Sequence, residues 1–109
     1  MSFNIIATEP FERKLKQLVK KHKSLKTDLQ KIIEQLEENP TLGIPLGNEC
    51  YKIRIAITSK GKGKSGGARI ITYVRVVSEN VFLMDIYDKS EQATISDKEL
   101  QLLIDLLAD

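Results

Sequence analysis

The sequence predicts an α+β fold: a small antiparallel β-sheet with an N-terminal helical hairpin on one face, followed by a C-terminal helix. Apolar residues recur at helical spacing over residues 9–38 and again after residue 96, and they alternate with polar residues over residues 51–87. This order of elements is typical of α+β domains. We expect one domain over residues 1–109, a length that suits a single hydrophobic core.

The first third of the chain predicts one strand and two helices. A strand is expected over residues 3–7 and an amphipathic helix over residues 9–22. Ser24 is expected to cap a second helix. Asn39-Pro40 should end that helix, because the residue before a proline avoids the helical region. Two helices joined by so short a break should pack as an antiparallel hairpin.

The remainder predicts a loop, three strands and a helix. Residues 41–49 are rich in glycine and proline and are expected to form a loop. Strands are expected over residues 51–58, 68–77 and 81–87, because their apolar residues alternate with polar ones. Ser96 begins a capping-box pattern that opens the last helix.

The strand pattern also predicts which side chains share a face of the sheet. In the last strand, alternation would put Phe82, Met84 and Ile86 on one face, with Leu83 among the residues of the other. If the apolar faces pack against the hairpin, the second face of the sheet should stay open to solvent or ligand. The side chains expected on this open face are those of Lys52, Arg54, Arg69, Tyr73, Arg75, Asp85 and Tyr87.

Positive charge is concentrated in the middle of the chain, although the net formal charge is only +2. Residues 50–78 contain seven Lys or Arg residues and no Asp or Glu. Such a local excess attracts phosphate-bearing ligands, although a loop of solvated lysines is the alternative. The glycines of residues 59–67 should keep that loop mobile. Its expected phosphate contacts are Lys60, Lys62 and Lys64.

A second group of lysines lies between residues 14 and 26, at the end of the first expected helix and the start of the second. For this group we favour a solvated outer face over a binding surface, because charged residues on amphipathic helices usually face water.

Several classes of function are disfavoured by the residues present. The Gly-Lys-Ser at residues 63–65 resembles the end of a P-loop, but Thr58 stands where the first glycine is needed and a strand follows. The single histidine, His22, is expected at the surface, and two-histidine ribonuclease chemistry is excluded by count. Cys50 is the one cysteine, so the chain can form no internal disulfide and no metal site is expected.

The chain is expected to work in the cytoplasm and away from membranes. No apolar run approaches the ~20 residues needed to cross a bilayer. The N-terminus lacks the basic and apolar regions of a secretory signal, and a lone cysteine agrees with a reducing compartment. From the residues alone, we favour a phosphate-binding module over an enzyme.

Three segments of the chain resemble the RelE/ParE superfamily of bacterial toxins, most closely its HigB-like branch. They are ECYKIRI at residues 49–55, GKSGGARIITYV at residues 63–74 and FLMDIYDKSE at residues 82–91. The resemblance implies a toxin of a type II toxin–antitoxin module, neutralised by a partner antitoxin. For RelE-type members it further implies ribosome-dependent cleavage of mRNA without a metal or other cofactor. The alternatives are a ParE-like inhibitor of DNA gyrase and an RNA-binding relative without activity.

The resemblance also implies roles for individual residues. Arg69 matches the arginine that contacts the scissile phosphate in the family, and Ser90 stands where cleaving members have an arginine. Tyr73 or Tyr87 is the candidate replacement for a tyrosine that some members carry. The expected catalytic residues are Lys52, Arg54, Arg69, Tyr87 and Lys89, and the expected RNA contacts are Lys60, Lys62, Lys64, Tyr73 and Arg75.

Overall fold

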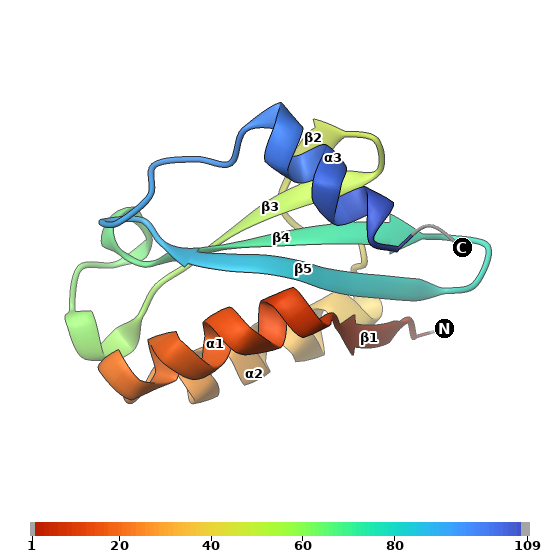
Figure 1. The fold of residues 1–109 in the computed structure, drawn as a ribbon. Helices are drawn as coiled ribbons and strands as arrows, with labels where there is room; N and C mark the ends of the chain where they lie inside the picture. The colour runs from red at the N-terminus through yellow and green to blue at the C-terminus, as the bar shows by residue number, and fades with distance from the viewer. Residues whose placement is uncertain (1, 108–109) are drawn as a thin grey trace.

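The computed structural model describes residues 2–107 and has a five-stranded sheet with helices on both faces (Figure 1). The strand order is β1-β5-β4-β3-β2, antiparallel except for the parallel pair β1 and β5. This arrangement confirms the predicted α+β class. The elements are β1 (Asn4–Ala7), α1 (Glu9–Lys21), α2 (Leu25–Glu38), β2 (Ile44–Gly47), β3 (Cys50–Ile55), β4 (Ala68–Arg75), β5 (Asn80–Asp88) and α3 (Asp97–Asp105), with short 3-10 turns at Thr58–Lys60 and Lys64–Gly66.

Two of the three helices begin with a side-chain cap. The hydroxyl oxygens of Thr8 and Ser96 each accept a hydrogen bond from the backbone amide three residues later, at 3.4 and 3.1 Å. The prediction that Ser24 caps α2 is wrong. Its backbone is already helical, and its hydroxyl is engaged elsewhere, donating to the Asp28 carboxylate at 2.8 Å.

The segment 41–49, expected to be a loop, contains the short edge strand β2. This strand pairs antiparallel with β3, with Ile44 opposite Lys52 and Gly47 opposite Cys50. Four residues that include a proline and a glycine give too little alternation to reveal a strand in the sequence.

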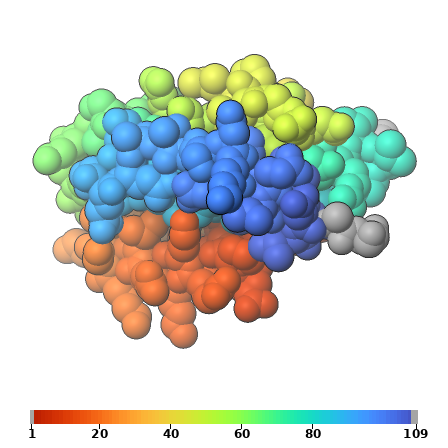
Figure 2. Space-filling model, turned by 45° about the horizontal axis from the view of Figure 1, so that its top comes forward, coloured from red at the N-terminus to blue at the C-terminus, as the bar shows by residue number. Residues whose placement is uncertain are grey.

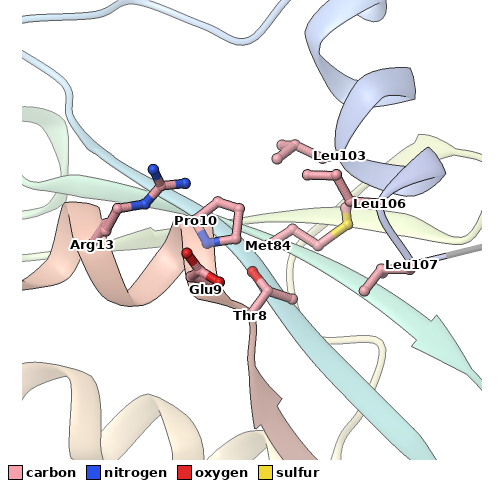
Figure 3. A pocket seen from close by; sticks show the side chains of 8 residues that line it. All are labelled: Thr8, Glu9, Pro10, Arg13, Met84, Leu103, Leu106 and Leu107. Carbon is pink, nitrogen blue, oxygen red and sulfur yellow. The ribbon is translucent and has the colours of Figure 1, made fainter.

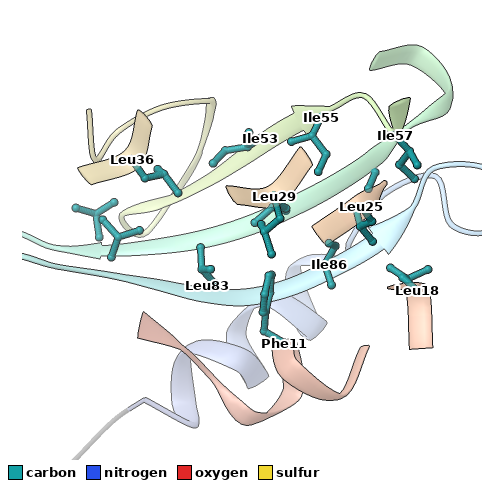
Figure 4. Close-up of a cluster of buried hydrophobic side chains, with 14 residues drawn as sticks. Phe11, Leu18, Leu25, Leu29, Leu36, Ile53, Ile55, Ile57, Leu83 and Ile86 are labelled. Carbon is teal, nitrogen blue, oxygen red and sulfur yellow. The ribbon is translucent and has the colours of Figure 1, made fainter. Parts of the chain in front are cut away.

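The larger hydrophobic core lies between the sheet and the hairpin of α1 and α2 (Figure 4). It confirms the predicted alternation in β3 and β4, because Ile53, Ile55, Ile70 and Val74 all face the hairpin. Burying each large apolar side chain contributes about 1.5–3 kcal/mol. The buried members are Phe11, Leu18, Leu25, Leu29, Leu36, Ile53, Ile55, Ile57, Ala68, Ile70, Val74, Val81, Leu83 and Ile86.

A second, smaller core lies on the opposite face of the sheet, under α3. The expectation that this face is open is therefore wrong for the part that α3 and the segment before it cover. The apolar side of α3 needs a surface to pack against, and the hairpin already fills the other face. The buried members are Cys50, Ile71, Met84, Tyr87, Ile95 and Leu100.

The strict alternation expected along the last strand is also wrong, because β5 contains a β-bulge. Ile71 and Thr72 are adjacent in β4, and they pair with Asp85 and Leu83 of β5. Met84 is therefore an extra residue in β5 without a partner in β4. Leu83 and Ile86 consequently face the hairpin, whereas Met84 and Tyr87 face α3.

Asp88, at the end of β5, holds three parts of the chain together. Its carboxylate is 4% exposed and accepts hydrogen bonds from Lys60 Nζ at 3.1 Å and from the Ser90 amide and hydroxyl at 2.9 and 2.7 Å. His22 Nε2 lies 3.0 Å from the same carboxylate, so the expectation of a surface histidine is wrong. Burial by itself raises the pKa of Asp88, but these hydrogen bonds outweigh it and hold the pKa well below its usual range.

We expect Asp88→Asn to lower the free energy of unfolding at pH 7 by roughly 2–4 kcal/mol, because Lys60 loses its buried carboxylate partner. A lowered folded-state pKa means that the carboxylate stabilises the fold above the unfolded-state pKa of about 3.9. That stabilisation is lost as the pH falls below this value. The variant should therefore show a weaker pH dependence than the wild type between about pH 5 and pH 2. Urea titrations over this range measure both effects.

Glu91→Gln is the control for this experiment. It removes the exposed ion pair with Lys21, whose charged atoms lie 3.4 Å apart, and should change stability by less than about 1 kcal/mol. Equal decreases in the free energy of unfolding of Asp88→Asn and Glu91→Gln would contradict the role assigned to Asp88.

Candidate functional site

Three neighbouring strands place Arg54, Arg69 and Tyr87 in one row across the sheet. Arg54 of β3 is the register partner of Arg69 of β4, and Arg69 is the partner of Tyr87 of β5. Strands are about 4.8 Å apart, so the row spans about 10 Å. Because Ile53 and Ile70 face the hairpin, alternation directs this row to the opposite face of the sheet. We call these three residues the arginine row.

Arg69 is held rigidly within the row. Its side chain is 4% exposed, and Nη1 donates to the carbonyl oxygens of Lys64 at 2.8 Å and Ala68 at 3.1 Å. Burial and the neighbouring charge of Arg54 lower the pKa of its guanidinium. Within residues 2–107 neither arginine forms an ion pair with a carboxylate. Two facing cations without a counter-charge favour an anion between them.

A groove of about 560 Å³ lies beside the row, between α2 and the open edge of β3. Asp28 lines it too, but hydrogen bonds from Thr58, at 2.6 and 2.9 Å, occupy its carboxylate. Burial alone raises the pKa of Asp28, and these bonds outweigh it, so the pKa is lowered and the group stays charged. The cationic side chains that line the groove are Lys31, Lys52, Arg54 and Lys64.

Gly67 fixes the position of the loop above Arg69. A Cβ atom at this residue would lie 1.9 Å from the carbonyl oxygen of Ile55, so β3 and the start of β4 can approach only if no side chain is present. The Gly67 carbonyl accepts a hydrogen bond from the Lys89 amide at 3.0 Å. Lys89 is thereby kept at the same end of the sheet as the arginine row.

The three loop lysines have different surroundings. Lys62 and Lys64 are exposed, as expected for adjustable phosphate contacts. Lys60 is instead half-buried against Asp88, which neutralises its charge. The ion pair could not be foreseen from the sequence, because 28 residues separate the partners.

Tyr87 belongs to the row but is covered by the second core. It is 4% exposed, and within residues 2–107 its hydroxyl has no hydrogen-bond partner. Burial is the main reason that the pKa of this phenol is raised. In this conformation the hydroxyl is closed to a substrate, because Tyr87 is buried in the same cluster as Ile95 and Leu100.

Tyr73 and Arg75 lie at the other end of the sheet. The Arg75 guanidinium carbon is 5.7 Å from the centre of the Tyr73 ring and 5.3 Å from that of Phe82. Along a strand, the six residues from Arg69 to Arg75 span about 20 Å. The structure therefore does not bring these two residues to the arginine row.

A second groove, of about 340 Å³, lies between the start of α1 and α3 (Figure 3). It is mainly apolar and contains none of the site residues predicted from the sequence. Its lining consists of Thr8, Glu9, Pro10, Arg13, Met84, Leu103, Leu106 and Leu107.

No three His, Cys, Asp or Glu side chains within residues 2–107 are grouped so that they could share a metal ion. No helix in the same range is both long and apolar enough to cross a membrane.

Sequence reasoning missed two residues near the site, Lys31 and Asp28. Both come from α2, and no local pattern connects that helix to a groove at the edge of β3. Their contribution follows from the tertiary packing alone.

We expect the two arginines of the row to differ in their effect on stability. Arg69→Ala should lower the free energy of unfolding by roughly 1–3 kcal/mol, because a buried side chain and its hydrogen bond to the Lys64 carbonyl are lost. Arg54→Ala should change it by less than about 0.5 kcal/mol, because Arg54 is exposed and faces a like charge. Urea denaturation of both variants measures the change in the free energy of unfolding. Equal decreases in the two variants would contradict the buried position of Arg69.

Comparison with known proteins agrees with this fold. Residues 8–108 match the profile of a family described as the RelE toxin of the RelE/RelB toxin–antitoxin system. An Escherichia coli RelE variant with two arginines replaced by alanine, in the free state, has a TM-score of 0.60 and 20% identity, over 85% of this chain and 90% of the other. The isolated E. coli RelE toxin has a TM-score of 0.62 and is 17% identical in sequence. The match covers 96% of this chain and 99% of that toxin. At these identities the two structures support the fold, whereas the family match extends over most of the sequence. The chain therefore belongs to the RelE toxin family of the RelE/RelB toxin–antitoxin system.

Proposed function

We propose that this toxin acts as a ribosome-dependent mRNA endoribonuclease and thereby inhibits translation. The observation that carries the proposal is the pair Arg54 and Arg69, which face each other from adjacent strands without a carboxylate partner within residues 2–107. Neighbouring strands lie about 4.8 Å apart. Two guanidinium groups that start from such neighbouring positions suit the oxygens of one phosphodiester. Lys52 and Lys64 line the adjoining groove, where they would contact the neighbouring phosphates of the strand.

The proposed reaction is an internal transfer at phosphorus. The 2′-oxygen of one nucleotide attacks the adjacent phosphorus, and the bond to the 5′-oxygen breaks. The products are a 2′,3′-cyclic phosphate and a free 5′-hydroxyl. Arg54 and Arg69 stabilise the negative charge that builds up on the phosphate oxygens. One of Lys52 and Lys89, as the neutral amine, takes the proton of the 2′-hydroxyl, and the other, as the ammonium, gives a proton to the leaving 5′-oxygen.

The shape of the site supports dependence on the ribosome. Attack requires the 2′-oxygen, the phosphorus and the leaving oxygen to lie nearly in line. The groove beside Arg54 is open, and Tyr87, the remaining member of the row, is buried. Little in this conformation would hold a flexible strand in line, so the ribosome would supply that alignment.

We further propose that the chain belongs to the HigB-like branch, because a lysine- and glycine-rich loop leads into GGARIITYV at residues 66–74. The partner would be a cognate antitoxin encoded beside it, and the toxin would act in the cytoplasm. An acidic antitoxin segment lying over the arginine row would neutralise it by charge complementarity.

Loss of either arginine of the row should strongly reduce cleavage. We expect Arg54→Ala and Arg69→Ala each to lower the single-turnover rate on a translated message by about 10²–10³-fold, the usual loss when one charge-stabilising donor is removed. Primer extension on messages from a reconstituted translation system locates and quantifies the cut ends.

Arg75→Ala is the matched control, because it removes the same charge from the far end of β4. Its rate should stay within about threefold of the wild type. Unchanged cleavage by Arg69→Ala would sink the proposed site. Intact messages together with growth arrest and DNA damage in expressing cells would favour the gyrase alternative, and growth arrest should be relieved by the cognate antitoxin.

A further inference from the structure

The segment that leaves the sheet after β5 is fixed on both sides of Lys89. The amide of Lys89 itself donates to the Gly67 carbonyl at 3.0 Å. The amide and the hydroxyl of Ser90 both donate to Oδ1 of Asp88, at 2.9 and 2.7 Å. The next two amides along the chain donate to the backbone carbonyl of Asp88, each at 3.0 Å. Segments that leave a sheet are usually mobile, so this restraint needs an explanation. We call residues 88–92 the Asp88 turn.

The pairing of β4 and β5 directs Lys89 toward the arginine row. Ala68 is the register partner of Asp88, so the hydrogen bond to Gly67 extends the pairing by one residue and puts Lys89 opposite Gly67. Side chains alternate along a strand, and the Asp88 carboxylate turns to Lys60 on the hairpin side. Lys89 therefore lies on the other face, two residues or about 7 Å along the strand from the row.

Lys89 is a cation without a counter-charge. It is partly buried, and within residues 2–107 its ammonium group forms no ion pair. A second lysine at this end of the sheet, Lys60, is neutralised by Asp88. Figure 1 shows the end of β5 beside the green loop of residues 58–67, which carries Lys60. The Asp88 carboxylate thus neutralises one lysine and orders the backbone that carries the other.

We propose that Ser90 is a positioning residue, which holds Lys89 where its amine can exchange a proton with the RNA. The proposal rests on the proposed function, in which Lys89 is one of two proton-transfer groups. The stem of a lysine is flexible, so the reach of its amine depends on where the backbone is held. The Ser90 hydroxyl is bonded to Asp88 on the hairpin side, so Ser90 acts through Lys89 and touches no substrate.

The test compares Ser90→Ala with Ser90→Thr in the full chain, on programmed ribosomes. Alanine removes the hydroxyl bond and leaves the amide bond to Asp88, so the fold should be kept. We expect Ser90→Ala to lower the saturating single-turnover rate about tenfold, because small displacements of a reacting group are costly. The toxin concentration for half-maximal cleavage should stay within about twofold, since no binding group is lost. Ser90→Thr keeps the hydroxyl and should stay within about threefold of the wild-type rate.

The deciding measurement repeats the substitution in the absence of Lys89. If Ser90 acts through Lys89, the double variant K89A/S90A should cleave at the rate of Lys89→Ala alone, because the group to be positioned is missing. A loss of about tenfold in both backgrounds would show that Ser90 acts independently and would overturn the inference. An unchanged rate in Ser90→Ala would also overturn it.

Ser78→Ala is the matched control, because it removes a hydroxyl from the turn at the other end of β5. The Ser78 hydroxyl donates to the Arg75 carbonyl at 3.4 Å, and it has no contact with the Asp88 turn. Its saturating rate and half-maximal concentration should match those of the wild type. An equal loss of rate in Ser78→Ala would attribute the effect of Ser90→Ala to a general loosening of the sheet and would contradict the inference.

Amide hydrogen exchange separates this inference from the proposed function, because it requires no cleavage. In the free toxin, Ser90→Ala should speed exchange of the Lys89 amide about tenfold, whereas Ser78→Ala should leave it unchanged. If the wild type does not cleave messages, the proposed function fails, and the exchange rate still decides whether Ser90 orders Lys89. If the wild type cleaves and Ser90→Ala changes neither rate nor exchange, the inference alone fails.

Discussion

The candidate site depends on one constraint, which is that a buried arginine is built into the central strand of the sheet. The central strand β4 is covered by the hairpin on one face and partly by α3 on the other, and Arg69 stands near its beginning. A buried guanidinium needs hydrogen-bond acceptors, and the Lys64 carbonyl of the preceding loop is one of them. The path of the loop, the close approach at Gly67 and the position of the neighbouring strand are therefore tied to one side chain.

Much of the architecture could be predicted from local pattern. Periods of about 3.6 and 2 identify the helices and the long strands, and alternation alone places Arg54 and Arg69 on the same face. Four residues of β2 were too few to show a period. The bulge at Met84 could not be foreseen either, because an extra residue in a strand changes no residue type.

The parts of the site that the sequence could not predict all depend on distant contacts. Asp88 binds Lys60 and His22, which lie 28 and 66 residues earlier in the chain. The burial of Tyr87 depends on where α3 packs, and an amphipathic helix can satisfy its apolar side on either face of a sheet. Sequence reasoning thus identified the charged residues of the candidate site, and the tertiary packing determines which of them are exposed. Figure 2 shows the C-terminal segment lying between the β2–β3 region and α1, where it closes part of a face that alternation leaves open.

The bulge in β5 has an electrostatic consequence. Counted onward from Leu83, regular alternation would turn Tyr87 toward the hairpin core and Asp88 toward the arginines. A carboxylate beside Arg69 could then form an internal salt bridge, which would lower the positive charge of this surface. Because Met84 adds one residue, Asp88 turns instead to Lys60 and His22 on the hairpin side. One additional residue in one strand thus determines whether the two arginines have a carboxylate neighbour on their own face of the sheet.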